Sequence, residues 1–514
     1  MVKQDEASAE KLPVVVIGAG PVGLAAAAHL ARHGLRFVVL EAGAGAGAAV
    51  SEWSHVRLFS PWRYNTDAEA RRLLEATGWS LPDADHLPSG AELVDGYLRP
   101  LASHPVLEPH IRYGSRVVAL SRDGFDRVRT AGRQAAPFVV RLADGDELLA
   151  RAVIDASGTW QTPNVLGVNG LAARGETEMG EFVEPSLPDV LGADRDRLAG
   201  KHILVVGAGH SAANTLLSLA ELVRAEPETT VTWAVRGASP DRAFGGGDAD
   251  ALPGRGALGS SLKALVDSGS VQLLAGFGVR GLELTDDKRV EVSGNGAGGE
   301  QKITVDRIVA ATGFRPDHSI ADELRLELDP ALGCTRELAP LIDPNLHSCG
   351  SVRPHGVDEL SHPEPNYFAV GMKSYGRAPT FLMATGYEQV RSIAAALAGD
   401  WEAARDVQLE LPETGVCSAT TGARAIATDV AARLGLSADI PAKLISATVG
   451  HISTTPDLRS AVHAAAADLG IRPEAALELA ALVSDELEAM MSGSGDGSSA
   501  ECEHADGAGV TSSC

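Results

Sequence analysis

The chain has 514 residues and is 45% hydrophobic, which supplies enough apolar material for two or three packed domains. Its formal net charge of -24 repels phosphate backbones, so nucleic acid is excluded as an expected partner. Five cysteines without a C-x-x-C pair argue against a disulfide framework and against a redox dithiol. The sequence has neither the apolar run of a signal peptide nor one long enough to span a bilayer, so we expect a cytoplasmic protein without a membrane partner.

A strand over residues 14–17, a glycine turn, a helix and a second strand that ends at residue 41 are predicted in this order. The turn reads G-x-G-x-x-G: the first glycine allows a tight bend, the second lets backbone amides approach a pyrophosphate, and the third lets the helix pack closely. The positions concerned are Gly18, Gly20 and Gly23, with Pro21 opening the helix predicted over residues 21–32. The helix N-terminus favours an anion because its N–H groups are unpaired. Glu41 ends the second strand, where a carboxylate would accept hydrogen bonds from a ribose.

A second unit of the same kind begins with the strand predicted over residues 203–206. Its turn reads G-x-G-x-x-A, with a small residue still in the close-packing position. The candidate phosphate contacts are Gly207, Gly209, His210, Ser211 and Ala212. The next strand ends at Arg236, where the first unit has Glu41. Because a guanidinium suits an additional 2′-phosphate that a carboxylate would repel, we predict FAD at the first turn and NADPH at the second.

Residues 242–259, RAFGGGDADALPGRGALG, are predicted to form a long glycine-rich loop after the second unit. Loops of this length in a compact domain are usually functional. We expect this loop to close over the nicotinamide nucleotide, with Arg242 as a second contact to the 2′-phosphate.

The sequence resembles the flavoproteins with two dinucleotide-binding domains, a superfamily that includes flavin-containing monooxygenases, Baeyer-Villiger monooxygenases and pyridine nucleotide-disulfide reductases. Besides the glycine turns, the resemblance rests on VIDASGTW (residues 153–160) and IVAATGFRPD (residues 308–317). Each is an apolar strand that ends in a small-residue turn, at Gly158 and Gly313, where the chain of that superfamily crosses between its domains. The resemblance implies an α/β fold with two Rossmann-like domains of three-layer ββα form, together with hydride transfer from NADPH to FAD.

The resemblance also implies an order of domains along the chain. The expected parts are a first FAD-binding part over 1–165, an NAD(P)-binding domain over 166–312, a second FAD-binding part over 313–412, a small helical module over 420–491 and a disordered Gly/Ser-rich tail over 492–514. Short amphipathic segments predict the helical module, with Pro456 and Pro473 in first-turn positions. The module could pack on the flavoprotein body, form a homodimer or bind another partner, and the residues leave these three roles open.

Residues 367–397 resemble the final flavin-binding segment of that superfamily, which consists of a strand, a glycine and a helix. The resemblance places Gly371 and Met372 against the flavin nucleotide. It also points the N-terminus of a helix beginning near Thr380 at the pyrimidine edge of the flavin, where negative charge would be favoured.

Residues 51–65 concentrate aromatic side chains in a chain that is only 4% aromatic. In the superfamily this loop runs alongside the flavin, so Trp53, His55 and Arg57 are expected to line the flavin ring.

The candidates for catalytic groups are Tyr375, Arg377, His55 and Cys349. Tyr375 and Arg377 would stand beside the flavin helix, where the Arg377 charge could offset reduced flavin or bind an anionic substrate. Cys349 belongs to a group with His347, Arg353 and His355 that could serve acid-base chemistry or hold a soft ligand.

Runs such as SEWSHVRLFSPW, GTWQTPN and LIDPNLHSCG are also similar to bacterial flavoproteins that are encoded with arsenic-resistance genes and labelled monooxygenase-like. This similarity makes an arsenical, or another soft small molecule, the candidate substrate. No metal ion is predicted, but soft metalloids prefer thiolates, so Cys417, Cys502 and Cys514 could capture such a species.

Three functions stay open. The first is an NADPH-oxidising monooxygenase, in which reduced FAD reacts with oxygen and a small-molecule substrate. Residues 161–200 contain no histidine, whereas monooxygenases of this type carry F-x-G-x-x-x-H in this region. The second function is therefore an NAD(P)H-dependent flavin reductase or dehydrogenase without oxygenation. The third is a redox-sensing or metalloid-binding protein that acts through its C-terminal thiols.

Overall fold

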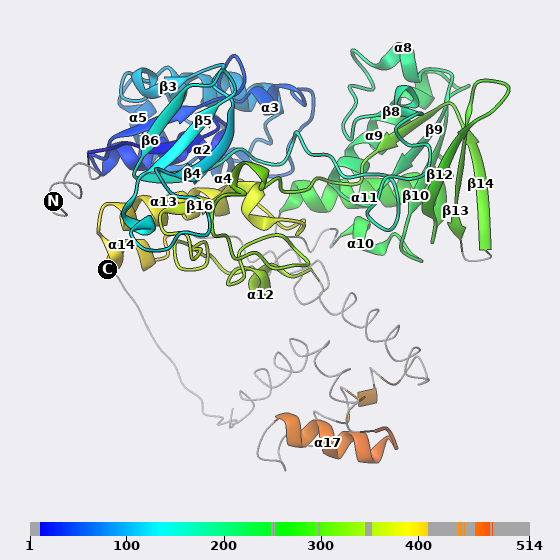
Figure 1. Ribbon diagram of the computed structural model, residues 1–514. Helices are drawn as coiled ribbons and strands as arrows, with labels where there is room; N and C mark the ends of the chain where they lie inside the picture. Colours follow the sequence, from blue (N-terminus) through cyan, green and yellow to red (C-terminus); the bar gives the residue numbers. More distant parts are fainter. Residues whose placement is uncertain are drawn as a thin grey trace, which may run out of the picture. The chain divides into compact units, whose positions relative to one another are not determined.

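The structure is a computed structural model that describes residues 11–245, 247, 250, 252–296, 299–344 and 352–409, followed by 440, 443–444, 447, 458–472 and 475. The chain divides into two compact units, Met1–Ser418 and Ala419–Cys514. In Figure 1 the described part of the first unit runs in colour from blue through green to yellow, and helix α17 (Leu458–Asp468) of the second unit is orange.

Five parallel strands build the first sheet, in the order β16-β7-β1-β2-β3. Their bounds are β16 (Tyr367–Ala369), β7 (Ala152–Asp155), β1 (Val14–Ile17), β2 (Phe37–Leu40) and β3 (Ile111–Arg112). Strand β1 is buried on both faces: Val14 and Val16 join the apolar cluster on the helical side, whereas Val15 and Ile17 join the cluster on the opposite side. Burial on both faces explains the uninterrupted apolar run of this strand. The strand predicted over residues 14–17 is confirmed.

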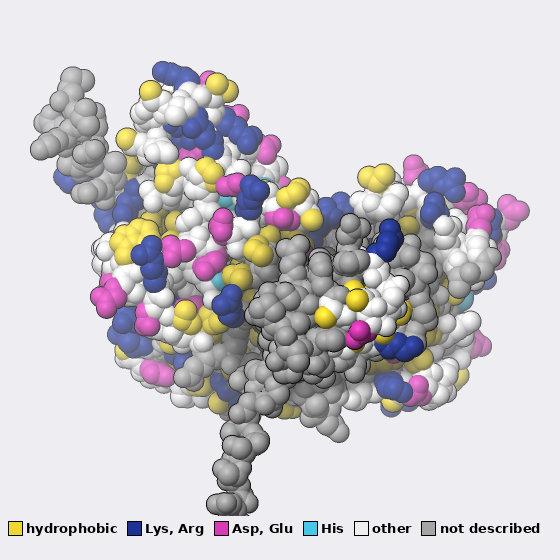
Figure 2. All heavy atoms as spheres, turned by 90° about the horizontal axis from the view of Figure 1, so that it is seen from below, with side chains coloured by type: hydrophobic (Ala, Val, Ile, Leu, Met, Phe, Trp, Pro, Cys, Tyr) yellow, Lys and Arg dark blue, Asp and Glu magenta, His cyan; other side chains and the backbone are white. Residues whose placement is uncertain are grey.

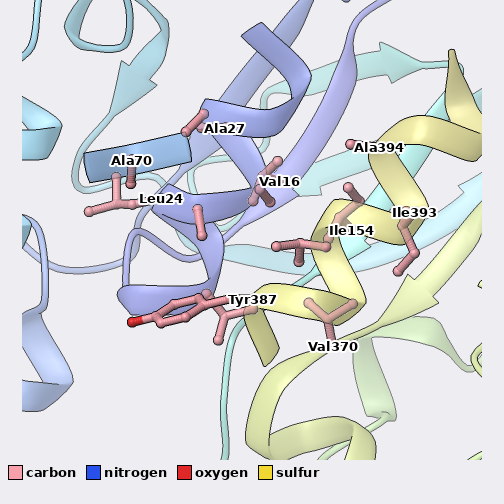
Figure 3. Packing of buried hydrophobic residues seen from close by; sticks show 14 of the residues in the cluster. Val16, Leu24, Ala27, Ala70, Ile154, Val370, Tyr387, Ile393 and Ala394 are labelled. Atoms are coloured by element: carbon pink, nitrogen blue, oxygen red, sulfur yellow. The ribbon is translucent and has the colours of Figure 1, made fainter. Parts of the chain in front are cut away.

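Helices α2 (Pro21–Arg32), α5 (Ala68–Glu75) and α13 (Met383–Leu397) supply the helical side of this core. Figure 3 shows Leu24 of α2, Val16 of β1 and Ile393 of α13 in one cluster. Residues 25–28 are all fully buried alanines, so the backbone of α2 approaches its neighbours closely. The helix predicted over residues 21–32 is confirmed. Helix α13 begins at Met383 rather than near Thr380, because the chain is still extended at Leu382.

An antiparallel sheet covers the other side of the first core. It consists of β4 (Val117–Arg122), β5 (Phe138–Leu142) and β6 (Glu147–Ala150). Phe138 and Val140 of β5 share an apolar cluster with Val15 and Ile17 of β1. The first domain therefore has helices, a parallel sheet and an antiparallel sheet as its three layers.

The second domain repeats this plan. Its parallel sheet has the order β11-β10-β9-β15-β8, with bounds β11 (Gln272–Ala275), β10 (Thr230–Val235), β9 (His202–Val206), β15 (Arg307–Ala310) and β8 (Val183–Glu184). Ile203 and Val205 of β9 pack with α9 (His210–Ala225) and α11 (Pro253–Asp267). Leu204 and Val206 pack instead with the antiparallel sheet of β12 (Gly278–Leu284), β13 (Val290–Gly296) and β14 (Gly299–Val305). The predicted α/β fold with two Rossmann-like domains is confirmed.

Short helices connect these layers. They are α3 (Ala48–Ser51), α4 (Trp62–Asn65), α6 (Gly90–Leu93), α7 (Arg99–Ala102), α8 (Arg195–Leu198), α10 (Asp241–Phe244), α12 (Ala339–Ile342) and α14 (Trp401–Arg405). None of the described helices is both long and apolar enough to cross a membrane.

The glycine-rich stretch of residues 242–259 is not one long loop, so that prediction was wrong. Helix α10 occupies its start, and α11 begins at Pro253. A Cβ at Gly256 would lie 2.1 Å from the Gly247 carbonyl oxygen, and one at Gly259 would lie 2.0 Å from the Phe244 carbonyl oxygen. At these two glycines the backbone of α11 lies in contact with the backbone of the preceding segment, where a Cβ would not fit. Composition alone does not reveal this role, because a glycine-rich stretch is typical of a loop.

The charged groups of the surface are mixed where they can be seen. On the face shown in Figure 2, Lys and Arg side chains alternate with Asp and Glu side chains rather than gathering in one stripe. The predicted C-terminal module is described only in part, by α17 and a few further residues. Cys417, Cys502 and Cys514 lie outside the described residues.

Candidate functional site

The first glycine turn, which follows β1, contains two kinds of glycine. Gly18 has a φ of +100°, and a Cβ there would lie 2.8 Å from the Ala156 carbonyl oxygen. A Cβ at Gly23 would lie 2.0 Å from the Gly18 carbonyl oxygen. Backbone atoms of the protein therefore leave no room for a side chain at either position. A Cβ at Gly20, in contrast, would meet nothing within 4 Å in the described structure, so the space beside this residue is open to a ligand.

Helix α2 begins directly behind this open position. Gly20 is the N-cap of α2, no described side chain caps the helix, and Pro21 has no N–H group. The Leu24 N–H group donates a hydrogen bond to the Gly20 carbonyl oxygen at 3.0 Å. The helix start consequently offers unpaired N–H groups and the positive end of the helix dipole to an anion.

Glu41 lies at the end of β2 beside the same turn. One carboxylate oxygen accepts a hydrogen bond from the Ala19 N–H at 2.7 Å, and the other accepts one from the Gly43 N–H at 2.7 Å. Each oxygen keeps a second lone pair, so the carboxylate can still accept a hydrogen bond from a ligand. The contact of Glu41 with a ribose stays a prediction.

The segment after β16 closes this edge of the sheet. It forms the 3-10 helix η7 (Gly371–Tyr375), with Gly371 at a φ of +68°. Cβ atoms at Gly371 and Gly386 would lie 3.3 and 2.6 Å from a methyl carbon of Val22, so η7 and α13 both pack on the first turn of α2. The carboxyl ends of β1 and β16 are therefore surrounded by a glycine turn, by η7 and by the first turns of two helices.

The predicted side chains of this segment have different surroundings. Met372 and Thr380 are half-buried, and the Thr380 hydroxyl group is buried without a hydrogen-bond partner among the described residues. A buried hydroxyl of this kind fits a site that is completed by a bound cofactor. Tyr375 is fully buried and packs against His355 and Phe381, at ring-centroid distances of 5.5 and 5.2 Å.

Arg377 is exposed, as is Arg353. His355 is buried, and its Nε2 atom lies 2.9 Å from the amide nitrogen of Gln389. Gln389 in turn accepts a hydrogen bond from the Gly371 N–H at 2.8 Å, so His355 supports η7 from behind. His347 and Cys349 lie outside the described residues.

Three half-buried aromatic rings meet where the two domains are connected. The ring of Trp53 lies 6.5 Å from that of Trp160, which lies 5.0 Å from the ring of Phe314. His55 and Arg57 are exposed, and the Arg57 guanidinium donates a hydrogen bond to a backbone carbonyl at 2.5 Å. The structure therefore brings Trp53, but neither His55 nor Arg57, into this aromatic cluster.

The two connections between the domains run side by side. Gly158 and Gly313 adopt φ values of +70° and +87° in the turns after β7 and β15. Behind these turns the Asn164 N–H donates to the Gly313 carbonyl oxygen at 2.9 Å, and the Arg315 N–H donates to the Thr162 carbonyl oxygen at 2.9 Å.

The second glycine turn, after β9, repeats the geometry of the first. Gly207 has a φ of +135°, and a Cβ there would lie 2.0 Å from the Ala311 carbonyl oxygen. A Cβ at Gly209 would meet nothing within 4 Å in the described structure. Ala212 is fully buried in the close-packing position, and Gly209 is the N-cap of α9, without a described side-chain cap.

His210 opens α9 and contacts the first domain. Its ring lies 4.5 Å from that of Phe59, and Ser211 beside it is half-buried. Loss of hydration, followed by the nearby charge of Arg255, lowers the pKa of His210 to about 4. The imidazole is therefore neutral at pH 7.

Arg236 directly follows β10 and is exposed. It lies at the carboxyl edge of the sheet, the same edge from which the turn after β9 leaves. Arg242 belongs to α10, and its side chain lies outside the described part of the structure.

An ion pair that the sequence patterns did not indicate lies beneath the first turn. The ammonium nitrogen of Lys373 lies 2.6 Å from a carboxylate oxygen of Asp155, and the two side chains are 2% and 0% exposed. Burial alone would raise the pKa of the Asp155 carboxyl, but Lys373 and the donors of Ser157 outweigh it and hold this pKa below its ordinary value. An acidic residue directly before the A-S-G turn was the available signal.

Two open glycine turns, each at a helix N-terminus on its own parallel sheet, define a protein with two dinucleotide-binding domains. The chain belongs to the pyridine nucleotide-disulphide oxidoreductase family, whose family model matches residues 15–332.

A similar curated protein is the indole-3-pyruvate monooxygenase YUCCA1 of Oryza sativa subsp. japonica. It is 30% identical over 206 residues, which are 40% of this chain and 44% of the rice protein. The match thus spans less than half the length of that relative.

Two solved structures share the fold. The bacillithiol disulfide reductase Bdr (YpdA) from Bacillus cereus has a TM-score of 0.55 at 19% identity, covering 76% of this chain and 99% of that one. The FAD-bound cadaverine monooxygenase DfoA from Erwinia amylovora has a TM-score of 0.53 at 15% identity, covering 78% and 98%.

The chain is thus a member of an oxidoreductase family, and a monooxygenase is among the proteins similar to it. FAD and NAD(P)H are the cofactors typical of the family.

Proposed function

We propose that the protein is an NADPH-oxidising monooxygenase that binds FAD at the turn of Gly18 and Gly20 and NADPH at the turn of Gly207 and Gly209. The observation that carries the assignment of the two cofactors is the difference between two otherwise equivalent turns. A carboxylate, Glu41, lies against the first turn, whereas the exposed Arg236 follows the strand next to the second. The carboxylate would repel a 2′-phosphate and the guanidinium would bind one.

The residues around the first turn suit a flavin dinucleotide. The N–H groups at the start of α2 would bind its pyrophosphate, and Glu41 would accept a hydrogen bond from its ribose. The buried Thr380 hydroxyl, which lacks a partner in the described structure, would gain one from the cofactor. When bound, FAD supplies the hydride acceptance and the oxygen chemistry.

We propose a small molecule as the substrate, and no nucleic acid or membrane as a partner. The rice relative is named for oxygenation of indole-3-pyruvate and the Erwinia protein for oxygenation of cadaverine. The resemblance of SEWSHVRLFSPW and related runs to flavoproteins encoded with arsenic-resistance genes makes an arsenical, or another soft small molecule, a further candidate.

Anaerobic mixing of the purified yellow protein with NADPH or NADH tests the cofactor part of the proposal. NADPH is expected to bleach the flavin absorbance faster than NADH does at equal concentration. Equal rates with both nucleotides would contradict the assignment of Arg236.

Reoxidation under labelled dioxygen tests the oxygenation. One candidate from each class, an organoarsenical, a 2-oxo acid and a diamine, is supplied to the reduced protein. A product that contains one labelled oxygen atom supports a monooxygenase. Hydrogen peroxide in one-to-one yield with NADPH, without an oxygenated product from any candidate, would count against oxygenation.

A further inference from the structure

The antiparallel sheet of the second domain, β12 to β14 (Figure 1), carries a pocket of about 230 Å³. This volume is below the about 300–1,000 Å³ of pockets for drug-sized ligands, so it suits a smaller molecule. Neither glycine turn contributes to the lining, and the pocket is therefore distinct from both candidate dinucleotide sites. The lining residues come from the loop before β8 and from all three strands of the sheet: Arg174, Arg280, Ser293, Gly294, Asn295 and Glu300.

The pocket lies on the outward face of this sheet. Val292 of β13 packs toward the parallel sheet, in one apolar cluster with β9. Because side chains alternate along a strand, Ser293 points to the opposite side. Ser293 is paired with Gly281 of β12, and Asn295 is paired with Glu300 of β14. Paired residues share a face of the sheet, so these positions come together on the outward side.

Two irregularities of β12 make room for arginine side chains on this face. A Cβ at Gly281 would lie 3.0 Å from Oγ of Ser293 and 3.6 Å from Nε of Arg174, so the guanidinium of Arg174 lies across a position without a side chain. A β-bulge between Val279 and Gly281 leaves Arg280 without a partner in the register. Such a bulge re-aims the side chain of its extra residue, and Arg280 lines the same pocket.

The backbone holds Arg174 and Arg280 next to each other. The Arg174 N–H donates to the Arg280 carbonyl oxygen at 3.0 Å, and the Leu282 N–H donates to the Arg174 carbonyl oxygen at 2.7 Å. Gly175, which follows, has a φ of +76°, and a Cβ there would lie 2.2 Å from the Leu282 carbonyl oxygen. The two arginines are therefore placed before a ligand binds, which lowers the entropy that binding costs.

The charges of the pocket are only partly balanced. Arg174 and Arg280 are exposed, and neither guanidinium forms an ion pair or a side-chain hydrogen bond with another described residue. Glu300 is the acidic residue of the lining. Lys302, further along β14, pairs with Glu291 at 2.6 Å. Two guanidinium groups and one carboxylate thus face the same space.

This set of charges favours one class of ligand. Two guanidinium groups bind a carboxylate with charge-assisted hydrogen bonds, whereas Glu300 offers an acceptor for an ammonium group. A phosphate monoester with its two negative charges suits the pocket less, because Glu300 repels it. The Ser293 hydroxyl donates to the Gly281 carbonyl oxygen at 3.2 Å and keeps a lone pair for a polar side chain of the ligand.

We propose that this pocket binds a small polar α-amino acid. Arg174 and Arg280 hold its carboxylate, Glu300 holds its ammonium group, and Ser293 and Asn295 contact its side chain. The site goes beyond the proposed function, because it lies apart from both glycine turns and needs neither dinucleotide.

Calorimetric titration of the full chain with related compounds tests the proposal. L-Asparagine carries both charged groups, succinamate lacks the ammonium group, and β-alaninamide lacks the carboxylate. L-Asparagine is expected to bind with a Kd of about 1 mM or below, succinamate about tenfold more weakly, and β-alaninamide not measurably. Inorganic phosphate is expected to bind more weakly than L-asparagine.

Substitutions in the pocket separate the two charged contacts. Arg174→Gln and Arg280→Gln are each expected to raise the Kd for L-asparagine about 10- to 100-fold, because each removes a charge-assisted hydrogen bond. Glu300→Gln should raise the Kd for L-asparagine about fivefold but lower that for succinamate, because it removes both the ammonium partner and the repulsion of the carboxylate. Arg141→Gln, on the exposed side of β5 in the first domain, is the matched control and should leave both values unchanged.

All the substituted residues are exposed, and thermal unfolding of each variant verifies its fold. If neither L-asparagine nor succinamate binds, the proposal is wrong, and the arginines serve as charges that protect the edge strand β12 from pairing with another chain. Binding that persists unchanged in Arg174→Gln and Arg280→Gln would also overturn it, since the ligand would lie elsewhere. Tighter binding of phosphate than of L-asparagine would overturn the amino acid class. Each of these outcomes leaves the proposed function untouched, because the titration requires no flavin reduction.

Discussion

At the level of single residues, the guanidinium of Arg236 sets the expected preference for the nicotinamide nucleotide. Arg236→Gln should raise the KM for NADPH about 10- to 100-fold, because a charge-assisted hydrogen bond is worth about 1.5–3 kcal/mol. The KM for NADH should stay unchanged. Steady-state oxidation of both nucleotides provides the measurement, with Arg224→Gln on the exposed side of α9 as the control. A parallel loss with both nucleotides would exclude a role in 2′-phosphate recognition.

A second prediction at this scale concerns Glu364, which is fully buried between two arginines. Its carboxylate accepts hydrogen bonds from Arg122 at 2.8 Å and from Arg133. Glu364→Gln leaves two buried guanidinium groups without their counter-charge, so the free energy of unfolding should fall by about 3–5 kcal/mol. Urea unfolding followed by circular dichroism measures this change.

The control for Glu364 is Glu147, whose ion pair with Arg141 is about half exposed at both side chains. Glu147→Gln should change the free energy of unfolding by less than about 1 kcal/mol. Similar effects of the two substitutions would show that the buried ion pairs of Glu364 with Arg122 and Arg133 contribute no more to stability than an exposed ion pair does.

Single residues were predictable where the local pattern alone determines their place. The glycines of both turns and Glu41 follow from spacing, because strand, turn and helix are consecutive in the chain. The ion pair of Lys373 and Asp155 joins residues 218 positions apart, so no local pattern could indicate it.

At the level of elements, a substitution at Gly20 in the first glycine turn should affect the binding of FAD but not the stability of the fold. Gly20→Ala should leave the free energy of unfolding within about 0.5 kcal/mol, because the added Cβ meets no atom within 4 Å. The same substitution should raise the Kd for FAD at least about tenfold, because the methyl group takes the space needed by the pyrophosphate.

Gly23→Ala, in the first turn of α2, is the matched substitution for Gly20→Ala at the N-cap. Its Cβ would lie 2.0 Å from the Gly18 carbonyl oxygen, so it should destabilise the domain even without cofactor. Thermal unfolding of the FAD-free variants together with FAD titration separates the two effects. Equal loss of stability in both variants would contradict the open position at Gly20.

Elements were predicted well where burial gives a strong pattern and poorly where glycines serve packing. The apolar run of β1 identifies a strand buried on two faces. The glycines at 256 and 259 look like loop residues, yet they lie in α11 and let its backbone touch other backbone atoms. Composition cannot separate these two uses of glycine, because the difference lies in the tertiary neighbours.

At the level of the whole molecule, we expect the free energy of unfolding to depend on pH through His210 and His362. Burial lowers the pKa of His210 and of His362 to about 4, below the ordinary value of 6.5. Between these values the unfolded chain binds protons that the folded chain does not, so stability is full above about pH 6.5 and is lost as the pH falls towards 4. Each histidine should contribute on the order of 1–3 kcal/mol.

Melting temperatures measured between pH 7.5 and 4.5 test this dependence. His362→Asn should flatten the profile, whereas His86→Asn, at an exposed position, should leave its slope unchanged. A slope that is the same in all three proteins would assign the acid sensitivity to other groups.

The most direct test of two separate dinucleotide sites is the titration of FAD-loaded protein with NADP+ in a calorimeter, with release of FAD followed by its fluorescence. We expect one bound FAD and one bound NADP+ per chain, with no FAD released during the titration. Displacement of FAD by NADP+, or a protein that retains FAD but binds no NADP+, would contradict it.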